Sequence, residues 1–441
     1  MSLYEIIKAL QSAKGSLAKQ AILNENAGNE LFKHYMKAVY DPAVSYWQTT
    51  IPAIDEHFSR GGEFHYMDLD FVAKLANREY TGAAAKSALL WRTACLNDDG
   101  RELMAMLIKR SIGGSVGETM VLKTWPGLFF VPSYMRCAGM SPKVKEEYAA
   151  LPFFYVQSKY DGSFGYLKSS TLSSHASLFT RAGSFYPAWL AERLAKNLPD
   201  GAVVMGEVLV FEAGKPLSRK VSNGMLNSLL QGGDDTGADI RMIAWDMVPA
   251  AEFKSGQCHK PYNLRLADMG QWVQSTTLSI ANTVVVTSLE QAFALNREAL
   301  LRGEEGTVWK KPDGIWRDSS SGTRDAVKVK IKFEAEYRVT GKYEGEGKAK
   351  GMLGGFNVET SCGKIANNVG SGFSDKQRIE FWAEDTTGWI VTLEANDVID
   401  KTGADTESLF LPIFVERRLD KTEADSRARV MAQLQAAKEG A

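Results

Sequence analysis

The sequence predicts a multidomain protein with an all-α N-terminal part, a central α+β part and a small C-terminal β-barrel. Three observations indicate this. Residues 1–130 show helical apolar periodicity with few alternating runs, residues 131–332 alternate short apolar strands with helices, and residues 333–441 hold short strands separated by glycine and polar turns. With 441 residues, the chain is long enough to form two or three hydrophobic cores.

In the N-terminal part, helices are expected over residues 3–23, 68–77 and 101–110. The stretch 110–115 then brings an arginine, two glycines and a hydroxyl to a loop or helix start. Backbone N–H groups in such a loop could meet a phosphate, while an ordinary helix terminator is an equal alternative.

The central part contains a predicted buried strand, residues 152–158, that leads into Lys159 and turns at Asp161-Gly162. An amine that attacks the α-phosphate of a nucleotide forms a phosphoramide, which splits one difficult condensation into two transfers. The amine must be deprotonated, so the site is expected to lower the lysine pKa from about 10.4 by burial or by neighbouring cations. Lys159 is thus a candidate nucleophile, and a plain Asp-Gly β-hairpin is the alternative.

Two carboxylates follow in strand-like surroundings. Glu207 lies in the middle of the apolar run 202–211, where a charge is costly unless it is paired or bound to a metal. Glu305 opens another predicted strand, which reaches Lys310 at its far side. Two carboxylates near a triphosphate suggest Mg²⁺, which would neutralise charge as pyrophosphate leaves. A buried salt bridge is the alternative for Glu207.

The segment from Val308 to Lys332 is locally basic, with seven basic residues against three acidic ones. The seven are Lys310, Lys311, Arg317, Arg324, Lys328, Lys330 and Lys332. Lys328 and Lys330 alternate with apolar residues, so on a strand they project from one face. This excess suits phosphate, although a solvated amphipathic strand has the same pattern.

Two more residues are candidates for a nucleotide pocket. Trp245 is expected at a strand end, where its ring could stack on a purine, although most such tryptophans belong to a core. Arg181 could hold a sugar or phosphate, or be an ordinary turn arginine.

The C-terminal part predicts strands at 337–340, 355–360, 389–395 and 409–415. This pattern suits an OB-fold barrel, a common platform for nucleic acids. The glycine- and lysine-rich segment 341–355 is expected to be a mobile loop or a solvated hairpin tip. From residue 423 onward the composition indicates a charged, alanine-rich terminal helix.

Taken in order, these motifs resemble those of the ATP-dependent DNA ligases, most closely the ligases of T-even-type bacteriophages. The resemblance runs nearly from end to end, through residues 19–23, 125–128, 159–162, 180–183, 222–224, 245–249, 305–306, 354–356, 409–413 and 418–422. It implies a helical DNA-binding domain (1–130), an adenylylation, or nucleotidyltransferase, domain (131–332) and an OB-fold domain with a C-terminal helix (333–441).

The resemblance also implies a reaction. Lys159 would be adenylylated by ATP with Mg²⁺, AMP would pass to the 5′-phosphate of a nick in duplex DNA, and the 3′-hydroxyl would displace it, in replication, repair and recombination. The expected catalytic residues are Lys159, Asp161, Lys328 and Lys330, and the expected metal ligands are Glu207 and Glu305. Nucleotide contacts are expected from Gln157 at the adenine edge, Phe164, Arg181, Glu207, Trp245, Arg324, Lys328, Lys330, Arg418 and Lys421, with Arg418, Asp420 and Lys421 on the pyrophosphate side.

Two positions depart from the family pattern. The family has Lys-x-Asp-Gly-x-Arg, whereas this chain has Phe164 in place of the arginine. Arg181 or Lys168 could replace that contact. Glu416 also stands where these phage ligases usually carry a basic residue.

Composition narrows the alternatives. A net charge of −1 argues against a protein that coats nucleic acid by bulk basicity. The four cysteines are far apart, which indicates free thiols in a reducing compartment and excludes the four-cysteine zinc module of NAD-dependent ligases. No export signal and no membrane-spanning run is visible, so a cytoplasmic monomer is expected, in the host cytoplasm if the protein is viral.

RNA ligases and mRNA-capping guanylyltransferases share the lysine motif, and an inactive nucleic-acid-binding module is a further alternative. The helical N-terminal part favours DNA, since those relatives generally lack it.

Overall fold

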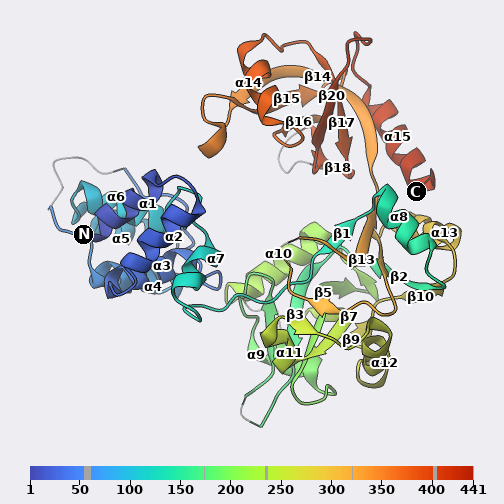
Figure 1. Ribbon diagram of the computed structural model, residues 1–441, viewed down its shortest axis with the longest axis horizontal. Helices are drawn as coiled ribbons and strands as arrows, with labels where there is room; N and C mark the ends of the chain where they lie inside the picture. Colours follow the sequence, from blue (N-terminus) through green and yellow to red (C-terminus); the bar gives the residue numbers. More distant parts are fainter. Residues whose placement is uncertain (54–60, 173, 234–236, 320, 401–404, 441) are drawn as a thin grey trace. The chain divides into compact units, whose positions relative to one another are not determined.

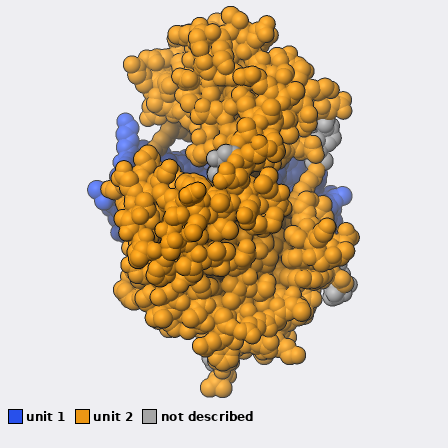
Figure 2. Space-filling model, turned by 90° about the vertical axis from the view of Figure 1, so that its right-hand side faces the viewer, with its two compact units in different colours: residues 1–132, 179–185 blue, residues 133–178, 186–441 orange. Residues whose placement is uncertain are grey.

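The computed structural model describes residues 1–53, 61–172, 174–233, 237–319, 321–400 and 405–440 (Figure 1). Contacts divide the chain into two compact units. The first contains residues 1–132 and 179–185, coloured blue in Figure 2, and the second contains residues 133–178 and 186–441, coloured orange. Among the described residues, no helix has the length and apolar character needed to cross a membrane.

The first unit is helical. Its helices are α1 (Leu3–Ser12), α2 (Ser16–Glu25), α3 (Glu30–Tyr40), α4 (Tyr66–Ala76), α5 (Gly82–Ala94), α6 (Asp98–Lys109) and α7 (Glu118–Thr124). The expected single helix over 3–23 is wrong, because Gly15 has a φ of 83° and separates α1 from α2. The apolar faces of α1, α3 and α6 supply Ile6, Tyr35 and Leu107 to one buried core.

The stretch after α6 behaves as a helix terminator. Arg110 adopts a left-handed φ of 56° at the C-terminus of α6, and its guanidinium donates to the backbone carbonyls of Val39, Asp41 and Val44. Its charge is thus used to join α6 to the segment after α3 (Glu30–Tyr40).

The second unit begins with a sheet in the order β1-β13-β11-β2-β10. Its strands are β1 (Cys137–Gly139), β2 (Phe154–Lys159), β10 (Thr283–Val286), β11 (Gly306–Lys310) and β13 (Thr323–Lys330). Helices α8 (Pro142–Ala149) and α13 (Leu289–Leu301) contribute to its core, which includes the fully buried Trp309.

A second sheet has the order β4-β3-β5-β7-β9. Its strands are β3 (Ser163–Lys168), β4 (Ser177–Thr180), β5 (Ala202–Glu212), β7 (Asp239–Pro249) and β9 (Leu278–Ile280), and β6 (Lys215–Pro216) pairs with β5. The neighbouring helices are α9 (Ala188–Ala195), α10 (Arg219–Leu230), α11 (Ala250–Ser255) and α12 (Tyr262–Trp272), and a short ladder joins β8 (Gln257–Cys258) to β12 (Trp316–Arg317).

The link after Lys159 is not a hairpin. Strand β2 ends at Lys159 in the first sheet, and β3 begins at Ser163 in the second. Gly162 is required at this crossing, because a Cβ there would lie 2.9 Å from the carbonyl oxygen of Val208. The hairpin alternative for Asp161-Gly162 is therefore wrong, and Lys159 stands where the chain passes from one sheet to the other.

The C-terminal part has a third sheet in the order β16-β15-β14-β17-β20. Its elements are β14 (Phe333–Glu344), the 3₁₀ turn η2 (Gly347–Ala349), β15 (Leu353–Glu359), β16 (Ala366–Val369), α14 (Asp375–Ala383), β17 (Ile390–Ala395), β18 (Asp397–Asp400), β19 (Glu407–Phe410), β20 (Ile413–Arg417) and α15 (Arg427–Gly440). Strands β18 and β19 pair with each other.

One expectation for this part is wrong, and one of two alternatives for another segment is confirmed. The strand predicted over 409–415 is two strands, because Leu411 has a φ of 54° and precedes a proline that separates β19 from β20. The segment 341–355 forms a β-hairpin, which was one of its two expected structures, with Glu344 still paired to Leu353.

Candidate functional site

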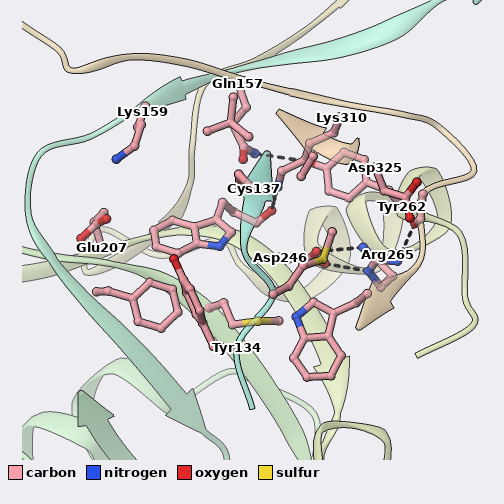
Figure 3. Close-up of a pocket in the computed structure, with 18 of the residues that line it drawn as sticks. Tyr134, Cys137, Gln157, Lys159, Glu207, Asp246, Tyr262, Arg265, Lys310 and Asp325 are labelled. Carbon is pink, nitrogen blue, oxygen red and sulfur yellow. Dashed lines mark hydrogen bonds and ion pairs between the residues drawn. The ribbon is translucent and has the colours of Figure 1, made fainter. Parts of the chain in front are cut away.

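A pocket lined by both sheets of the second unit brings together five of the expected site residues (Figure 3). Gln157, Lys159, Phe164, Glu207 and Trp245 all line it. In Figure 3, Lys159 and Glu207 lie together at one side, and Tyr262, Arg265 and Asp325 lie at the other. The pocket thus has a charged end around the lysine and a second end built from aromatic and hydrogen-bonding groups.

Beside the charged end, Glu305, which does not itself line the pocket, joins two lysines, and the second of them, Lys330, also lies outside the lining. Glu305 forms ion pairs with Lys159 and with Lys330. The register explains this, because Gly306 on the central strand β11 is opposite Lys159 on β2 and opposite Lys330 on β13. In addition, the Glu305 backbone N–H donates to the Lys159 carbonyl at 3.0 Å.

This arrangement corrects one expectation about the lysine. Burial by itself would lower the pKa of Lys159, but the carboxylates of Glu305, Glu207 and Asp161 outweigh burial and raise that pKa above its ordinary value. Lys159 and Lys330 hold the pKa of Glu305 below its ordinary value despite burial. In the structure Lys159 is therefore a paired ammonium group and not a free amine.

Glu207 is a buried carboxylate on β5. Glu207 is 9% exposed, and its Oε2 atom has no hydrogen-bond partner. Burial raises the pKa of Glu207 to about 8, Lys159 opposes this, and Glu305 adds to it. Within the described part of the chain Glu207 makes no ion pair, so the buried salt bridge considered for it is absent.

The two carboxylates have the chemistry of a sparse cation site. Within the described ranges no group of three His, Cys, Asp or Glu residues is arranged to hold a metal. Mg²⁺ needs few protein oxygens when substrate phosphates complete its shell. An unpartnered buried Oε2 on Glu207, next to the lysine-paired Glu305, fits such an ion better than it fits a fully protein-ligated metal.

At the opposite end, β2, β11 and α12 form a polar floor. Gln157 is 1% exposed, and its Nε2 donates to Thr283 Oγ1 at 2.8 Å and to Tyr262 Oη at 3.2 Å. Lys310 Nζ donates to the backbone carbonyl of Trp245 at 2.6 Å. Burial lowers the pKa of Lys310 to about 8, against the opposing charge of Asp246.

One wall of the pocket is aromatic. The Phe164 ring lies 5.0 Å from that of Trp245, 4.6 Å from that of Tyr166 and 5.4 Å from that of Tyr134. Phe164 therefore has ring contacts of its own in place of the family arginine. Trp245 is half-buried in the interior of β7, so the expectation that it ends a strand is wrong.

Asp161 lies just after the lysine but does not line the pocket. Its Oδ1 accepts from Arg219 Nη1 at 2.7 Å, and burial raises the pKa of Asp161 while Arg219 opposes the shift. Arg219 begins α10, whose Asn223 accepts a 2.9 Å hydrogen bond from Ser163.

Several expected residues do not line this pocket. Lys328 is exposed on β13, and Arg324 pairs with Glu147 of α8 (Pro142–Ala149). Arg181 belongs to the first compact unit.

The two C-terminal cations are engaged elsewhere in the second unit. Arg418 and Lys421 pair with Glu336 of β14 at 2.7 Å and 2.9 Å, and Arg418 also pairs with Asp420 at 2.6 Å. Neither residue lines the pocket.

Other pocket residues were not expected from the sequence. They are Tyr134, Cys137, Tyr262, Arg265 and Lys310. Lys310 had a visible signal, a charge at the end of an apolar strand that begins beside Glu305. Arg265 had none, because its partner Asp246 is 19 residues away and on another element.

A lysine at the junction of two sheets, with two carboxylates beside it and an aromatic-walled pocket behind it, is the kind of site that can carry covalent nucleotidyl transfer. Comparison with known proteins points to the same class. The chain is 27% identical to the DNA ligase of Enterobacteria phage T4 and 26% identical to that of Enterobacteria phage T6, and each comparison covers 96% of both chains.

Two further comparisons concern the fold. A family model described as DNA ligase OB-like domain matches residues 344–402. A solved structure named Pmar-Lig_PreS3 has a TM-score of 0.74 at 22% identity, and the match covers 95% of this chain and 99% of that one. The predicted resemblance to T-even phage DNA ligases is confirmed, as is a mixed helix-and-sheet fold with an OB-like domain.

Proposed function

We propose that the protein is an ATP-dependent DNA ligase that seals nicks in duplex DNA through a lysyl-AMP intermediate on Lys159 and then a DNA-adenylate. The observation that carries the proposal is the position of Lys159 in the lining of the pocket, paired with Glu305 and near the Glu207 carboxylate. The similarity to the T4 and T6 DNA ligases over nearly the whole chain supports the choice of DNA.

In the first step, the Lys159 amine forms a bond to the α-phosphorus of ATP as the bond to pyrophosphate breaks. The lysine must first lose a proton, and its ion pair with Glu305 opposes that loss. When Glu305 turns to another partner, the largest influence that raises the pKa of Lys159 is lost, and burial, which lowers that pKa, is then opposed by Glu207 and Asp161. Glu305 would thus determine when the nucleophile becomes available.

Mg²⁺ is proposed as the partner held by Glu207 and Glu305, and when bound it would supply positive charge that offsets the charge on the departing pyrophosphate. Glu207 is suited to this by its unpartnered oxygen. Lys330, which also pairs with Glu305, and the exposed Lys328 on the same strand are proposed contacts of the α-phosphate.

The base of ATP would enter the end of the pocket opposite Lys159, with Gln157 at its edge and Trp245 and Phe164 along its face. In the later steps AMP passes to the 5′-phosphate of the nick, and the 3′-hydroxyl then displaces it. Each step is a displacement at phosphorus, so positioning and charge stabilisation do most of the catalysis.

The remaining expected residues belong to contacts outside the pocket. Arg418 and Lys421, now paired with Glu336, would move to the pyrophosphate side during the first step. Arg181 and Arg324 stay as proposed phosphate or sugar contacts. The domain assignment 1–130, 131–332 and 333–441 is likewise part of the proposal, with the helical part as the DNA-binding domain.

The test is to incubate the protein with Mg²⁺ and labelled ATP, GTP or NAD⁺, and then to add nicked DNA or nicked RNA. We expect an acid-labile AMP adduct from ATP alone, lost in Lys159→Ala, and joining of the DNA nick. Lys143→Ala removes an exposed lysine from the first turn of α8 and serves as the control.

No adduct from the wild-type protein would sink the mechanism. An adduct from GTP would favour a capping-type enzyme, and joining of RNA alone would favour an RNA ligase.

A further inference from the structure

Trp245 occupies a β-bulge. Met205 pairs with Asp246 and Gly206 pairs with Ala244, so β7 carries one residue more than β5 at this point, and that residue is Trp245. A bulge re-aims the extra side chain and takes its backbone out of the regular ladder. The Trp245 side chain lines the pocket, and its carbonyl oxygen is available to a donor from another element.

The glycine opposite the bulge is required by this geometry. A Cβ on Gly206 would lie 2.5 Å from the carbonyl oxygen of Ile243 and 2.9 Å from Met242 Cε. Close approach of β5 and β7 therefore accompanies the bulge, one residue before Glu207.

Lys310 provides the donor for the bulge carbonyl. It is the last residue of β11, in the other sheet, and is 6% exposed. Its Nζ lies 2.6 Å from the Trp245 carbonyl oxygen and 4.3 Å from the centre of the Tyr262 ring. The lysine thus joins the two sheets across the pocket, and a hydrogen bond from a charged donor is stronger than a neutral one.

The residue after Trp245 is fixed independently. Asp246 receives hydrogen bonds from Arg265 Nε and Nη2, both at 2.8 Å, and Arg265 also donates to the Gly314 carbonyl at 3.0 Å. Asp246 and Arg265 are 5% and 2% exposed. With the following residue anchored in this way, the rotation of the Trp245 peptide depends on the hydrogen bond from Lys310.

We propose that Lys310 is a positioning residue for the nucleotide base: by holding the bulge carbonyl of Trp245, it keeps the indole turned toward the base in the pocket. A lysine is a costly residue to bury, and here its hydrogen bond and its contact with the Tyr262 ring offset that cost. The inference rests on the proposed function, since it takes ATP as the ligand and Trp245 as its stacking partner.

The test measures lysyl-adenylate formation by the full chain as a function of ATP concentration. Lys310→Met removes the donor at nearly constant size, and we expect the KM for ATP to rise about tenfold with kcat within about twofold, the loss expected for a hydrogen bond from a charged group. Lys310→Gln keeps a donor without the charge and should raise KM by a smaller factor. Lys311→Met should leave KM unchanged, because Lys311 pairs with Glu147 and does not line the pocket.

The decisive comparison uses Trp245→Ala. If Lys310 acts through the indole, Lys310→Met should cause no further rise in KM in a protein that already carries Trp245→Ala and so lacks the indole. Multiplied effects in the double variant, or a fall in kcat with unchanged KM, would overturn the proposal. If Lys310→Met is unfolded at the assay temperature, Lys310→Gln decides: a raised KM supports the role, and a wild-type KM overturns it. Failure of the proposed function is distinct, because the wild-type protein would then form no adduct.

Discussion

Glu207 couples the stability of the protein to pH. The pKa of its carboxyl is raised by burial from 4.5 to about 8, so between these values the folded protein keeps a proton that the unfolded chain has lost. Stability therefore falls as pH rises from about 4.5 to about 8 and changes little from this group above pH 8. Glu207 is suited to bind a cation, and when no cation is bound its buried carboxylate lowers the stability of the folded protein.

Glu207→Gln should remove this dependence. Without nucleotide or Mg²⁺, we expect the variant to melt about 2–4 °C above the wild-type protein at pH 8 and close to it at pH 5, as followed by calorimetry. Glu212→Gln, an exposed carboxylate at the end of the same strand, is the matched control. A rise in melting temperature at pH 5 as large as the rise at pH 8 would contradict the explanation.

Phe164 has a packing role that an arginine cannot fill. Its ring contacts Trp245, Tyr166 and Tyr134, and its backbone pairs directly with Glu207 on β5. An arginine here would remove the ring contacts and place a guanidinium within reach of the Glu207 carboxylate.

Phe164→Arg should therefore slow lysyl-adenylate formation. We expect a decrease of roughly tenfold if the variant loses one aromatic contact and its guanidinium also occupies the free oxygen of Glu207. Phe164→Tyr keeps the ring and should stay near the wild-type rate. Single-turnover labelling with ATP measures both. If Phe164→Arg joins nicks at or above the wild-type rate, Phe164 has no role of its own and its only effect is the loss of the contact that an arginine makes in the ligases this chain resembles.

At the residue scale, the sequence predicts the charged end of the pocket better than its floor. Lys159, Glu207 and Glu305 were predictable because each charge interrupts or ends an apolar run. The paired state of Lys159 was not, because the Glu305 ion pair forms between residues 146 positions apart. Arg265 could not be predicted for the same reason, because its partner Asp246 lies 19 residues away on another element. Lys310 ends an apolar strand, but its hydrogen bond to the Trp245 carbonyl depends on the fold.

At the scale of elements, local pattern predicts strands and helices but not their partners. The strand that leads into Lys159 is predictable from its apolar run. The membership of β2 and β3 in two different sheets is not, because it depends on pairing with β11 and β5, far along the chain. The bulge at Trp245 could not be predicted from local sequence either, because it is defined by the register between β5 and β7. A break such as the one between β19 and β20 is local, and Pro412 was its available signal.

At the scale of the whole molecule, the pairing of Arg418 and Lys421 with Glu336 bears on when these two cations can reach a bound nucleotide. Every residue that lines the pocket lies between Tyr134 and Ala326, whereas Arg418 and Lys421 are paired with Glu336 on β14. If these two cations assist the departure of pyrophosphate, they must exchange Glu336 for the nucleotide. Glu336 would then restrain the first step and release the cations only when ATP competes for them.

Glu336→Gln should consequently speed lysyl-adenylate formation. We expect a gain of roughly threefold at low ATP, because Glu336 is buried but Arg418 and Lys421 are partly exposed, and ion pairs of such cations involve modest free energies. Glu334→Gln is the control, because Glu334 is exposed two residues earlier on the same strand. Rapid-quench labelling of the protein with ATP measures this step, and sealing of a nick that already carries AMP measures the last one. The last step should not gain, since pyrophosphate takes no part in it. A slower first step in Glu336→Gln would mean that Glu336 orients Arg418 and Lys421 for their work, and the restraint would then be disproved.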